Sequence, residues 1–444
     1  MKPTKLNLNQ DDLFRRRLSN QLNPRHELFK LSSMVPWDQL ETEFADLYDE
    51  NQVAGRPAKP IRLMIGLILL QNMYNLSDES VVRSWAENPY WQYFCGYDYL
   101  QWEFPIDSSS LTRWRQRLGP ERMEKILSMT ISLAVTTGTI KKEDLEVVIA
   151  DTTVMPKNIT FPTDTKLIEK ARIKLVNLSK SNGIALRQNY NRVSKLLTKK
   201  IGGYLHAKQM KRARRAMKHH KTIVGRVMRD CERQVENNED LRRKFFQTLS
   251  QTHHLLERKR SDSKKIYSLH ESHVDCISKG KAHKKYEFGC KVSLTITHRE
   301  VGIITSISAL HGNPFDGHTL KAALASSERN TLSKVRRAFV DEGYKGHGVE
   351  DAVVYRSRQN KGVTRRIKRE INRRQAIEPY IGHIKSECKL GLSRLKGIVG
   401  DKINAISSAA AYNLKLIINH LREVLLQILY LMIRVQKIKV SAAY

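Results

Sequence analysis

The chain has 444 residues, which exceeds a single small module, so two or three folding units are expected. Hydrophobic residues make up 40% and charged residues 28%, a balance that excludes a wholly disordered chain. The 78 Lys and Arg outnumber 45 Asp and Glu, giving a formal net charge of +33 that repels itself unless a polyanion screens it. Nucleic acid is the usual polyanion, although a membrane surface or an acidic protein would also fit this charge.

The apolar stretches and the cysteines indicate a cytoplasmic protein with no membrane partner. Residues 1–18 lack the apolar run of a signal peptide. The stretch from Val424 to Ile433 is about half the length of a membrane span, and we interpret it as a buried helix. None of the five cysteines has C-x-x-C spacing, which favours a reduced compartment. For a DNA-acting protein, association with the nucleoid is then expected.

Residues 1–135 are predicted to form a helical domain. Ser77 and Asn88 are placed as N-caps, and the segment SSLTRWRQRLG begins a helix that should end at Gly119. A short helix precedes this segment, so the arrangement resembles a helix-turn-helix. Arg113 and Arg115 are therefore candidates for DNA contacts. The alternative is a basic, solvated helix in a small bundle.

Aromatic side chains are dense in the same region. They could stack on bases, but such a cluster is more often a hydrophobic core. The residues concerned are Trp85, Tyr90, Trp91, Tyr93, Phe94, Trp102 and Trp114.

The sequence pattern changes from helical to strand-like after Lys141, where EVVIADTT predicts a short strand ending at Asp151. Residues 163–262 return to helical patterning and are interpreted as a basic helical insertion. No acid occurs between Lys195 and Arg229, which favours contact with the DNA backbone over a plain solvated surface. The residues predicted to make these contacts are Lys211, Arg212, Arg214 and Arg215.

Further strand patterns follow the insertion. They are KKIYSLHES, YEFGCKVSLTI, GIITSISAL, RRAFVDEG and AVVYRS, with one capped helix before RRAFVDEG and only helices after AVVYRS. This order is that of the α/β ribonuclease H-like fold, a mixed five-stranded sheet with flanking helices. Residues 136–444 are accordingly predicted to be one catalytic domain, interrupted at 163–262 and ending in helices.

In that fold the first and fourth strands are neighbours, so Asp151 and Asp341 should meet. Cutting a phosphodiester requires charge neutralisation at the attacking and leaving oxygens, which two divalent cations held by carboxylates provide. A third acid, Glu378, shares one helical face with Ile371, Arg374 and Lys385 if 371–385 is one helix. Pro379 leaves another interpretation open, in which a helix starts there and Glu378 is only its N-cap.

Several long segments resemble the DDE transposases of bacterial insertion sequences in group five. They include GRPAKPIRLMIGLILLQNMYNLSDESVVRSWAENPYWQYFCG, ADTTVMPKNITFPTDT, KGKAHKKYEFGCKVSL, VDEGYKG, RRQAIEPYIGHIK and LSRLKG, in the family's order. The resemblance implies that Asp151, Asp341 and Glu378 coordinate two Mg²⁺ or Mn²⁺ ions. Arg374 and Lys385 match the family's glutamate signature, whereas Ile371 stands where that signature has tyrosine.

The resemblance further implies nicking at element ends followed by attack of a 3′ hydroxyl on target DNA. The implied partners are double-stranded DNA, as terminal inverted repeats and target, and a second copy of the chain in a dimer or larger synaptic complex. The alternative is an inactive or repurposed relative that only binds DNA. The remaining acids receive structural interpretations, with Asp164 and Asp316 placed as helix caps.

Overall fold

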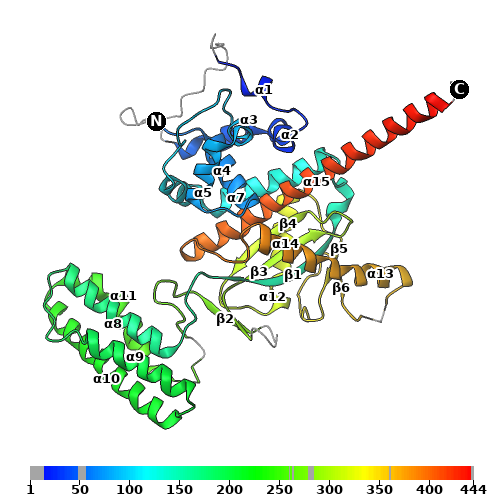
Figure 1. Cartoon of the computed structure of the whole chain (residues 1–444). Helices are drawn as coiled ribbons and strands as arrows, with labels where there is room; N and C mark the ends of the chain where they lie inside the picture. The colour runs from blue at the N-terminus through cyan, green and yellow to red at the C-terminus, as the bar shows by residue number, and fades with distance from the viewer. Residues whose placement is uncertain are drawn as a thin grey trace. The chain divides into compact units, whose positions relative to one another are not determined.

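The computed structural model describes residues 15–48, 57–259, 261–262, 265–278, 285–359 and 362–441, with side chains up to residue 427 except 425. Residues 1–14 of the predicted N-terminal domain lie outside the described residues. The chain divides into two compact units (Figure 1). Unit 1 comprises 1–156 and 290–444, and unit 2 comprises 157–289. The insertion predicted at 163–262 therefore corresponds to a separate unit with wider bounds.

Unit 1 begins with helices, as predicted. They are α1 (Leu18–Gln21), α2 (Glu27–Met34), α3 (Trp37–Glu43), the 3₁₀ turn η1 (Ala45–Leu47), α4 (Ile61–Met73), α5 (Asp78–Glu87), α6 (Pro89–Phe94) and α7 (Ser109–Thr136). The Ser77 side chain accepts a hydrogen bond from the Ser80 amide, and Asn88 caps α6 in the same manner. Both predicted N-caps are confirmed.

Helix α7 contains a break at Gly119, where the sequence predicted a helix end. Gly119 has φ +69° and Pro120 follows it, so a residue without Cβ relieves the strain at the break. The helix before α7 ends at Phe94, and residues 95–108 connect the two. This connection is longer than the short turn expected for a helix-turn-helix.

The sheet has the predicted neighbours. Its strands are β1 (Val147–Pro156), β2 (Asp275–Ser278), β3 (Tyr286–Thr297), β4 (Ile304–Leu310), β5 (Arg337–Val340) and β6 (Val353–Arg356). Strand β4 pairs antiparallel with β3, and the order continues β3, β1, β5, β6, with parallel pairing from β1 to β6. The short β2 pairs with the first four residues of β3, so the sheet has six strands where a five-stranded sheet was predicted.

Two strand predictions were displaced. The segment KKIYSLHES is irregular where described, and the strand in this region lies just after it, at β2. Strand β1 does not end at Asp151 but continues to Pro156. Its pairing with β5 covers Val147 to Ile149 only, so Asp151 lies beyond the part shared with β5.

Helices pack on this sheet and join it to the N-terminal helices in one core. The later helices are α12 (Asp316–Thr331), α13 (Arg365–Arg373), the 3₁₀ turn η3 (Arg374–Ala376), α14 (Ile377–Glu387) and α15 (Gly397–Ser441). Helix α15 contacts α4, α7 and β4, and one cluster of buried apolar side chains runs from Leu28 to Ile418. The boundary predicted at residue 135 therefore does not separate two compact units.

The long helix α15 contains the stretch interpreted from sequence as buried. Val424 and Leu426 are exposed, which differs from that interpretation, and the side chains from 428 onward lie outside the described residues. Across the described part of the chain, none of the helices combines the length and apolarity needed to traverse a lipid bilayer.

Unit 2 is built on four helices, seen in green in Figure 1. They are α8 (Asp164–Ser181), α9 (Asn191–His206), α10 (Met210–Val235) and α11 (Glu239–Glu257). Three of these helices meet at the Glu169 carboxylate on α8. It pairs with Arg172 at 2.6 Å, with His220 of α10 at 3.2 Å and with the Ser194 hydroxyl of α9.

These contacts predict a pH dependence of stability. Burial alone would raise the pKa of Glu169, but hydrogen bonds from His220, Arg172 and Ser194 lower it from 4.5 to about 2. A depressed folded-state pKa stabilises the protein above pH 4.5, and this contribution is lost as the pH falls toward 2. Glu169→Gln should therefore lower the melting temperature at pH 7, with the difference from wild type narrowing between about pH 5 and pH 2 in circular dichroism melts. A difference that is constant with pH would contradict this role.

Candidate active site

Asp151 and Asp341 meet at one end of the central parallel strand pair. The paired register ends at Ile149 opposite Phe339, and each aspartate lies two residues further along its strand direction. Arg374 lies between them: its Nη1 is 3.3 Å from Asp151 Oδ2, and its Nη2 is 3.4 Å from Asp341 Oδ1. One guanidinium thus bridges two carboxylates that are 190 residues apart in sequence.

The environment of Asp151 differs from that of Asp341. The side chain of Asp151 is 20% exposed, whereas that of Asp341 is 53% exposed. Burial, together with the nearby charges of Asp341 and Asp316, raises the pKa of Asp151 to about 6, against the opposing effects of the Thr152 amide and Arg374. Arg374 therefore offsets the repulsion between acids held close together.

Asp316 is a third acid at this place, and the sequence prediction of a helix cap missed it. It is the first residue of α12, but Phe315 occupies the N-cap position and no side chain caps the helix. The Asp316 Oδ1 atom accepts hydrogen bonds from Thr152 Oγ1 and Lys291 Nζ, each at 2.9 Å. The sequence did offer one indication of this acid: Lys291 lies within an apolar strand pattern, and a lysine buried there needs a negatively charged partner nearby.

Glu378 occupies a different position from the one expected for a single helix. The segment is a continuous helical run of α13, the 3₁₀ turn η3 and α14, in which Ile371 and Arg374 are buried whereas Glu378 is exposed. Glu378 and Pro379 are the second and third residues of α14, where a proline removes no helical hydrogen bond. Pro379 therefore neither kinks a helix nor makes Glu378 an N-cap.

The three predicted metal ligands do not all lie close together. Among the described residues, the carboxylate oxygens of Asp151, Asp341 and Glu378 do not all fall within 4.8 Å of one another. Helix α14, which carries Glu378, packs against β1, which carries Asp151. Lys385 is half-buried in the last turn of the same helix.

The aspartate pair fits a divalent cation by its chemistry. Asp151 and Asp341 already converge on one positively charged group, and carboxylate oxygens are the ligands that Mg²⁺ and Mn²⁺ prefer. A cation bound there would take over the charge neutralisation that the Arg374 guanidinium provides.

The two predicted DNA-contacting arginines of α7 have opposite environments. Arg113 is exposed and donates to Ser109 Oγ on its own helix. Arg115 is buried and donates to both carboxylate oxygens of Asp78, at 2.9 and 2.6 Å, and to Gln71 Oε1 at 2.7 Å. The prediction that Arg115 contacts DNA is therefore corrected: its guanidinium holds α7 against α4 and α5.

The aromatic cluster is mainly core, in agreement with the more common alternative. Trp85, Trp91, Phe94 and Trp114 are buried. Trp102 differs, since it is 82% exposed in the connection before α7.

Helix α10 carries the predicted cations of unit 2 on its exposed side. Lys211 and Arg215 begin a stripe that continues at helical spacing through Lys218, Arg226, Arg229 and Arg233. We call these six residues the cationic ridge. All six are exposed, and the ridge spans about 33 Å at about 1.5 Å per residue. Arg212 and Arg214 are exposed on its two flanks.

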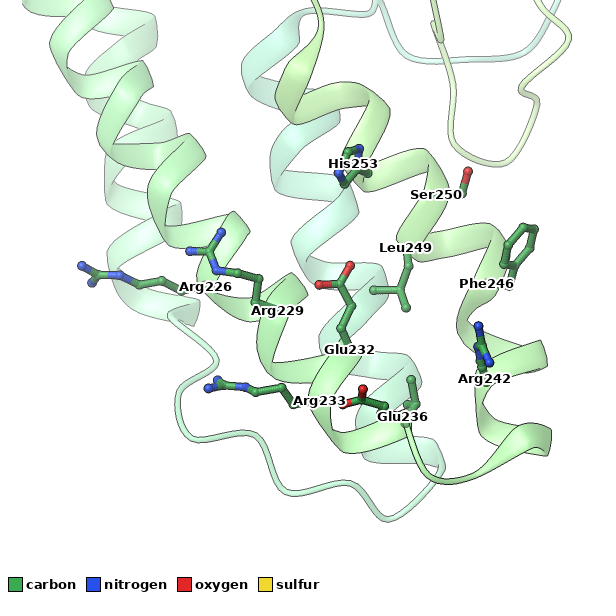
Figure 2. A pocket seen from close by; sticks show the side chains of 11 residues that line it. Arg226, Arg229, Glu232, Arg233, Glu236, Arg242, Phe246, Leu249, Ser250 and His253 are labelled. Carbon is green, nitrogen blue, oxygen red and sulfur yellow. The ribbon is translucent and has the colours of Figure 1, made fainter.

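A pocket of about 790 Å³ opens between the C-terminal part of α10 and α11 (Figure 2). Figure 2 shows Arg226, Arg229 and Arg233 along α10, with Phe246 and Arg242 on α11. Glu232 and Glu236 also line this pocket. The ridge is thus accompanied by acids at its C-terminal end but not at its N-terminal end.

Comparisons with known proteins found two matching family models and a relative. A family model described as "Transposase domain (DUF772)" matches residues 16–117, and one described as "Transposase DDE domain" matches residues 248–414. The uncharacterized protein ORF8 in the nfe locus of Rhizobium meliloti is 44% identical over 209 residues, covering 47% of this chain and 100% of that protein. No solved structure matches the chain.

The chain belongs to the DDE transposases of insertion sequences. Membership implies an enzyme that acts on DNA.

The buried position of Arg115 generates a stability prediction. Arg115→Ala leaves the Asp78 carboxylate without its counter-charge and should lower the free energy of unfolding by about 3 kcal/mol. Arg113→Ala, two residues away and exposed, should change it by less than about 0.5 kcal/mol. Urea unfolding of the two variants measures the difference, and equal effects would contradict the structural role of Arg115.

Proposed function

We propose that this transposase binds the ends of its insertion sequence and catalyses metal-dependent strand cleavage and strand transfer. The observation that carries the proposal is the convergence of Asp151 and Asp341 on one cationic group at the end of adjacent parallel strands. The strand order β4, β3, β1, β5, β6 supports a ribonuclease H-like catalytic fold, in which this strand end is where nucleic acid is cut.

Asp151, Asp341 and Glu378 would hold two Mg²⁺ or Mn²⁺ ions. When bound, the ions neutralise charge on the attacking and leaving oxygens of the phosphodiester. Water attacks phosphorus in the first step, breaking the bond to the 3′ oxygen, which leaves as a hydroxyl. That hydroxyl then attacks a target phosphorus and releases a new 3′ hydroxyl, so the number of phosphodiester bonds is unchanged in the second step. No covalent bond to the protein is required.

Arg374 and Lys385 are proposed to contact phosphates beside the acids. The Arg374 guanidinium already lies beside both aspartates, and its side chain is only 9% exposed, so it could exchange its carboxylate partners for a phosphate bound at the same place. A bidentate fork also suits a phosphate as well as it suits carboxylates. Glu378 would complete the ligand set from the first turn of α14.

The cationic ridge is proposed to contact the DNA backbone. Its length of about 33 Å is close to one turn of duplex DNA, and the sequence of α10 contains no acid before Asp230. Lys211 and Arg215 belong to the N-terminal half of the ridge, Arg212 and Arg214 flank it, and Arg113 on α7 is a further candidate.

The proposed reaction also implies an oligomer and a cellular location. Two element ends have to be held together, which requires a homodimer or larger synaptic complex. The enzyme would act on the nucleoid in the cytoplasm.

A second candidate is a relative that binds DNA without cutting it. Two observations favour it: Ile371 replaces the tyrosine of the family's signature, and Glu378 is not clustered with the two aspartates. Wild-type protein that shifts element-end DNA but never nicks it with Mn²⁺ would support this candidate.

Cleavage requires Asp341 if the aspartate pair is catalytic. Asp341→Ala should reduce Mg²⁺-dependent nicking of labelled element-end DNA by more than about 100-fold, because even indirect partners of metal ligands contribute about 10–100-fold. DNA binding in a gel shift should remain. The adjacent Glu342→Gln, an exposed acid paired with Arg358, is the control and should cut normally. Retained cleavage by the Asp341 variant would refute the site.

The ridge predicts a change in salt dependence. Lys211, Arg215 and Lys218 replaced together by Gln should lower the slope of log affinity against log salt for duplex DNA by about 3, since each phosphate that a cation neutralises contributes about 0.9 to that slope. The matched control replaces Arg242, Arg243 and Lys244 of α11, which have Glu239 and Asn182 as partners. Fluorescence anisotropy gives both slopes, and equal reductions would mean that the ridge is not a localised DNA contact.

A further inference from the structure

Asp316 connects two strands that lead into the active site. Its Oδ1 atom accepts from Thr152 Oγ1 on β1 and from Lys291 Nζ on β3, each at 2.9 Å. Lys291 also donates to the carbonyl oxygen of Pro314 at 2.6 Å, so the lysine fixes the entry to α12 as well as its first residue. An ionised carboxylate paired with an ammonium makes these bonds stronger than neutral ones.

Thr152 relays this connection to the catalytic acid. Its backbone amide donates to Asp151 Oδ1 at 2.7 Å, while its hydroxyl donates to Asp316. The orientation of Thr152 is thereby held from the α12 side, and the orientation of the Asp151 carboxylate is held by Thr152.

The segment after Asp341 also lies against the start of α12. A Cβ at Gly317 would come within 2.4 Å of the Lys345 carbonyl oxygen, so only glycine permits this approach. A Cβ at Gly343 would lie 3.7 Å from Asp316 Oδ2. Tyr344 is buried in the same cluster as Leu320 of α12, which fastens residues 341–345 to this helix.

A cap role does not account for these contacts. The hydrogen bonds of Asp316 go to side chains of two strands rather than to amides of its own helix. An acid at a helix start needs neither partner, since Asp164 occupies the same position of α8 and pairs with an arginine distant in sequence.

We propose that Asp316 is a positioning residue of the aspartate pair, which holds β1, β3 and the segment 341–345 in the arrangement that brings Asp151 and Asp341 to one cation. The role rests on the proposed function, because the pair must serve as the metal site. Lys291 is the cationic partner that holds the Asp316 carboxylate in place.

The geometric part is tested without metal or DNA. Hydrogen exchange of the full chain, followed by mass spectrometry, should show faster exchange for peptides covering 147–156 and 337–346 in Asp316→Ala than in wild type, by about tenfold or more. Asp164→Ala is the matched control, an acid at the same helix position, and its effect should be confined to α8 and its neighbours. Unchanged exchange in both active-site peptides would overturn the proposal.

The functional part uses Mn²⁺ as probe. Electron paramagnetic resonance should show weaker Mn²⁺ binding by Asp316→Asn, by about 10–100-fold, and the same for Lys291→Met, whereas Lys291→Arg should restore most of the affinity. The double variant Asp316→Asn with Lys291→Met should bind Mn²⁺ about as tightly as the single variant with the lower Mn²⁺ affinity, because both substitutions remove the same contact. Additive losses, or melting temperatures that fall with Mn²⁺ affinity intact, would overturn the role.

The two proposals fail in different ways. If wild-type protein binds no Mn²⁺ and cuts no DNA, the proposed function fails, while the exchange comparison still reports whether Asp316 holds the two segments. If wild-type protein binds Mn²⁺ and Asp316→Asn binds it equally well, only the positioning role is refuted.

Discussion

The structure of the site depends on the electrostatics of two aspartates brought together by parallel strands. Register alone would place two negative charges side by side, and burial of Asp151 makes that arrangement unfavourable. The Arg374 guanidinium resolves the conflict by pairing with both carboxylates. Because Arg374 lies on a 3₁₀ turn between α13 and α14, these helices are placed by the same interaction.

Two other acids of unit 1 are also paired with cations from different elements. Asp316 is matched by Lys291, and Asp78 by Arg115, so each of these acids has a cation from a different element. Such pairs add little net stability, because desolvation offsets most of their attraction, but an unpaired member is costly. They therefore specify which segments meet. The shared apolar core, from the N-terminal helices to α15, supplies the free energy that holds those segments together.

Much of this arrangement could be predicted from the sequence, and the failures have physical causes. The order of strands and helices predicted that β1 and β5 are neighbours, and Asp341 follows directly after β5 as expected. The caps at Ser77 and Asn88 are local interactions, readable within three residues. Arg115 was misassigned because its partner Asp78 lies 37 residues away, beyond any local pattern.

Asp316 was missed for a related reason. An acid that starts a helix has the same local pattern whether it interacts with its own helix or with side chains from distant strands. Helical periodicity through 371–385 likewise could not reveal the 3₁₀ turn Arg374–Ala376, or that Arg374 is buried whereas Glu378 is exposed. The position of Glu378 at the site remains a prediction.

The two ends of unit 2 are only a hydrogen bond apart, since the Lys157 amide donates to the Phe288 carbonyl at 2.8 Å. A module whose ends are adjacent can be added to a strand pair without stretching it, and the entropy of closing the intervening chain grows only slowly with its length. The sheet that carries the aspartate pair and the α-helical module can accordingly change independently, and a relative with a different module at this position would keep the strand register that brings Asp151 and Asp341 together.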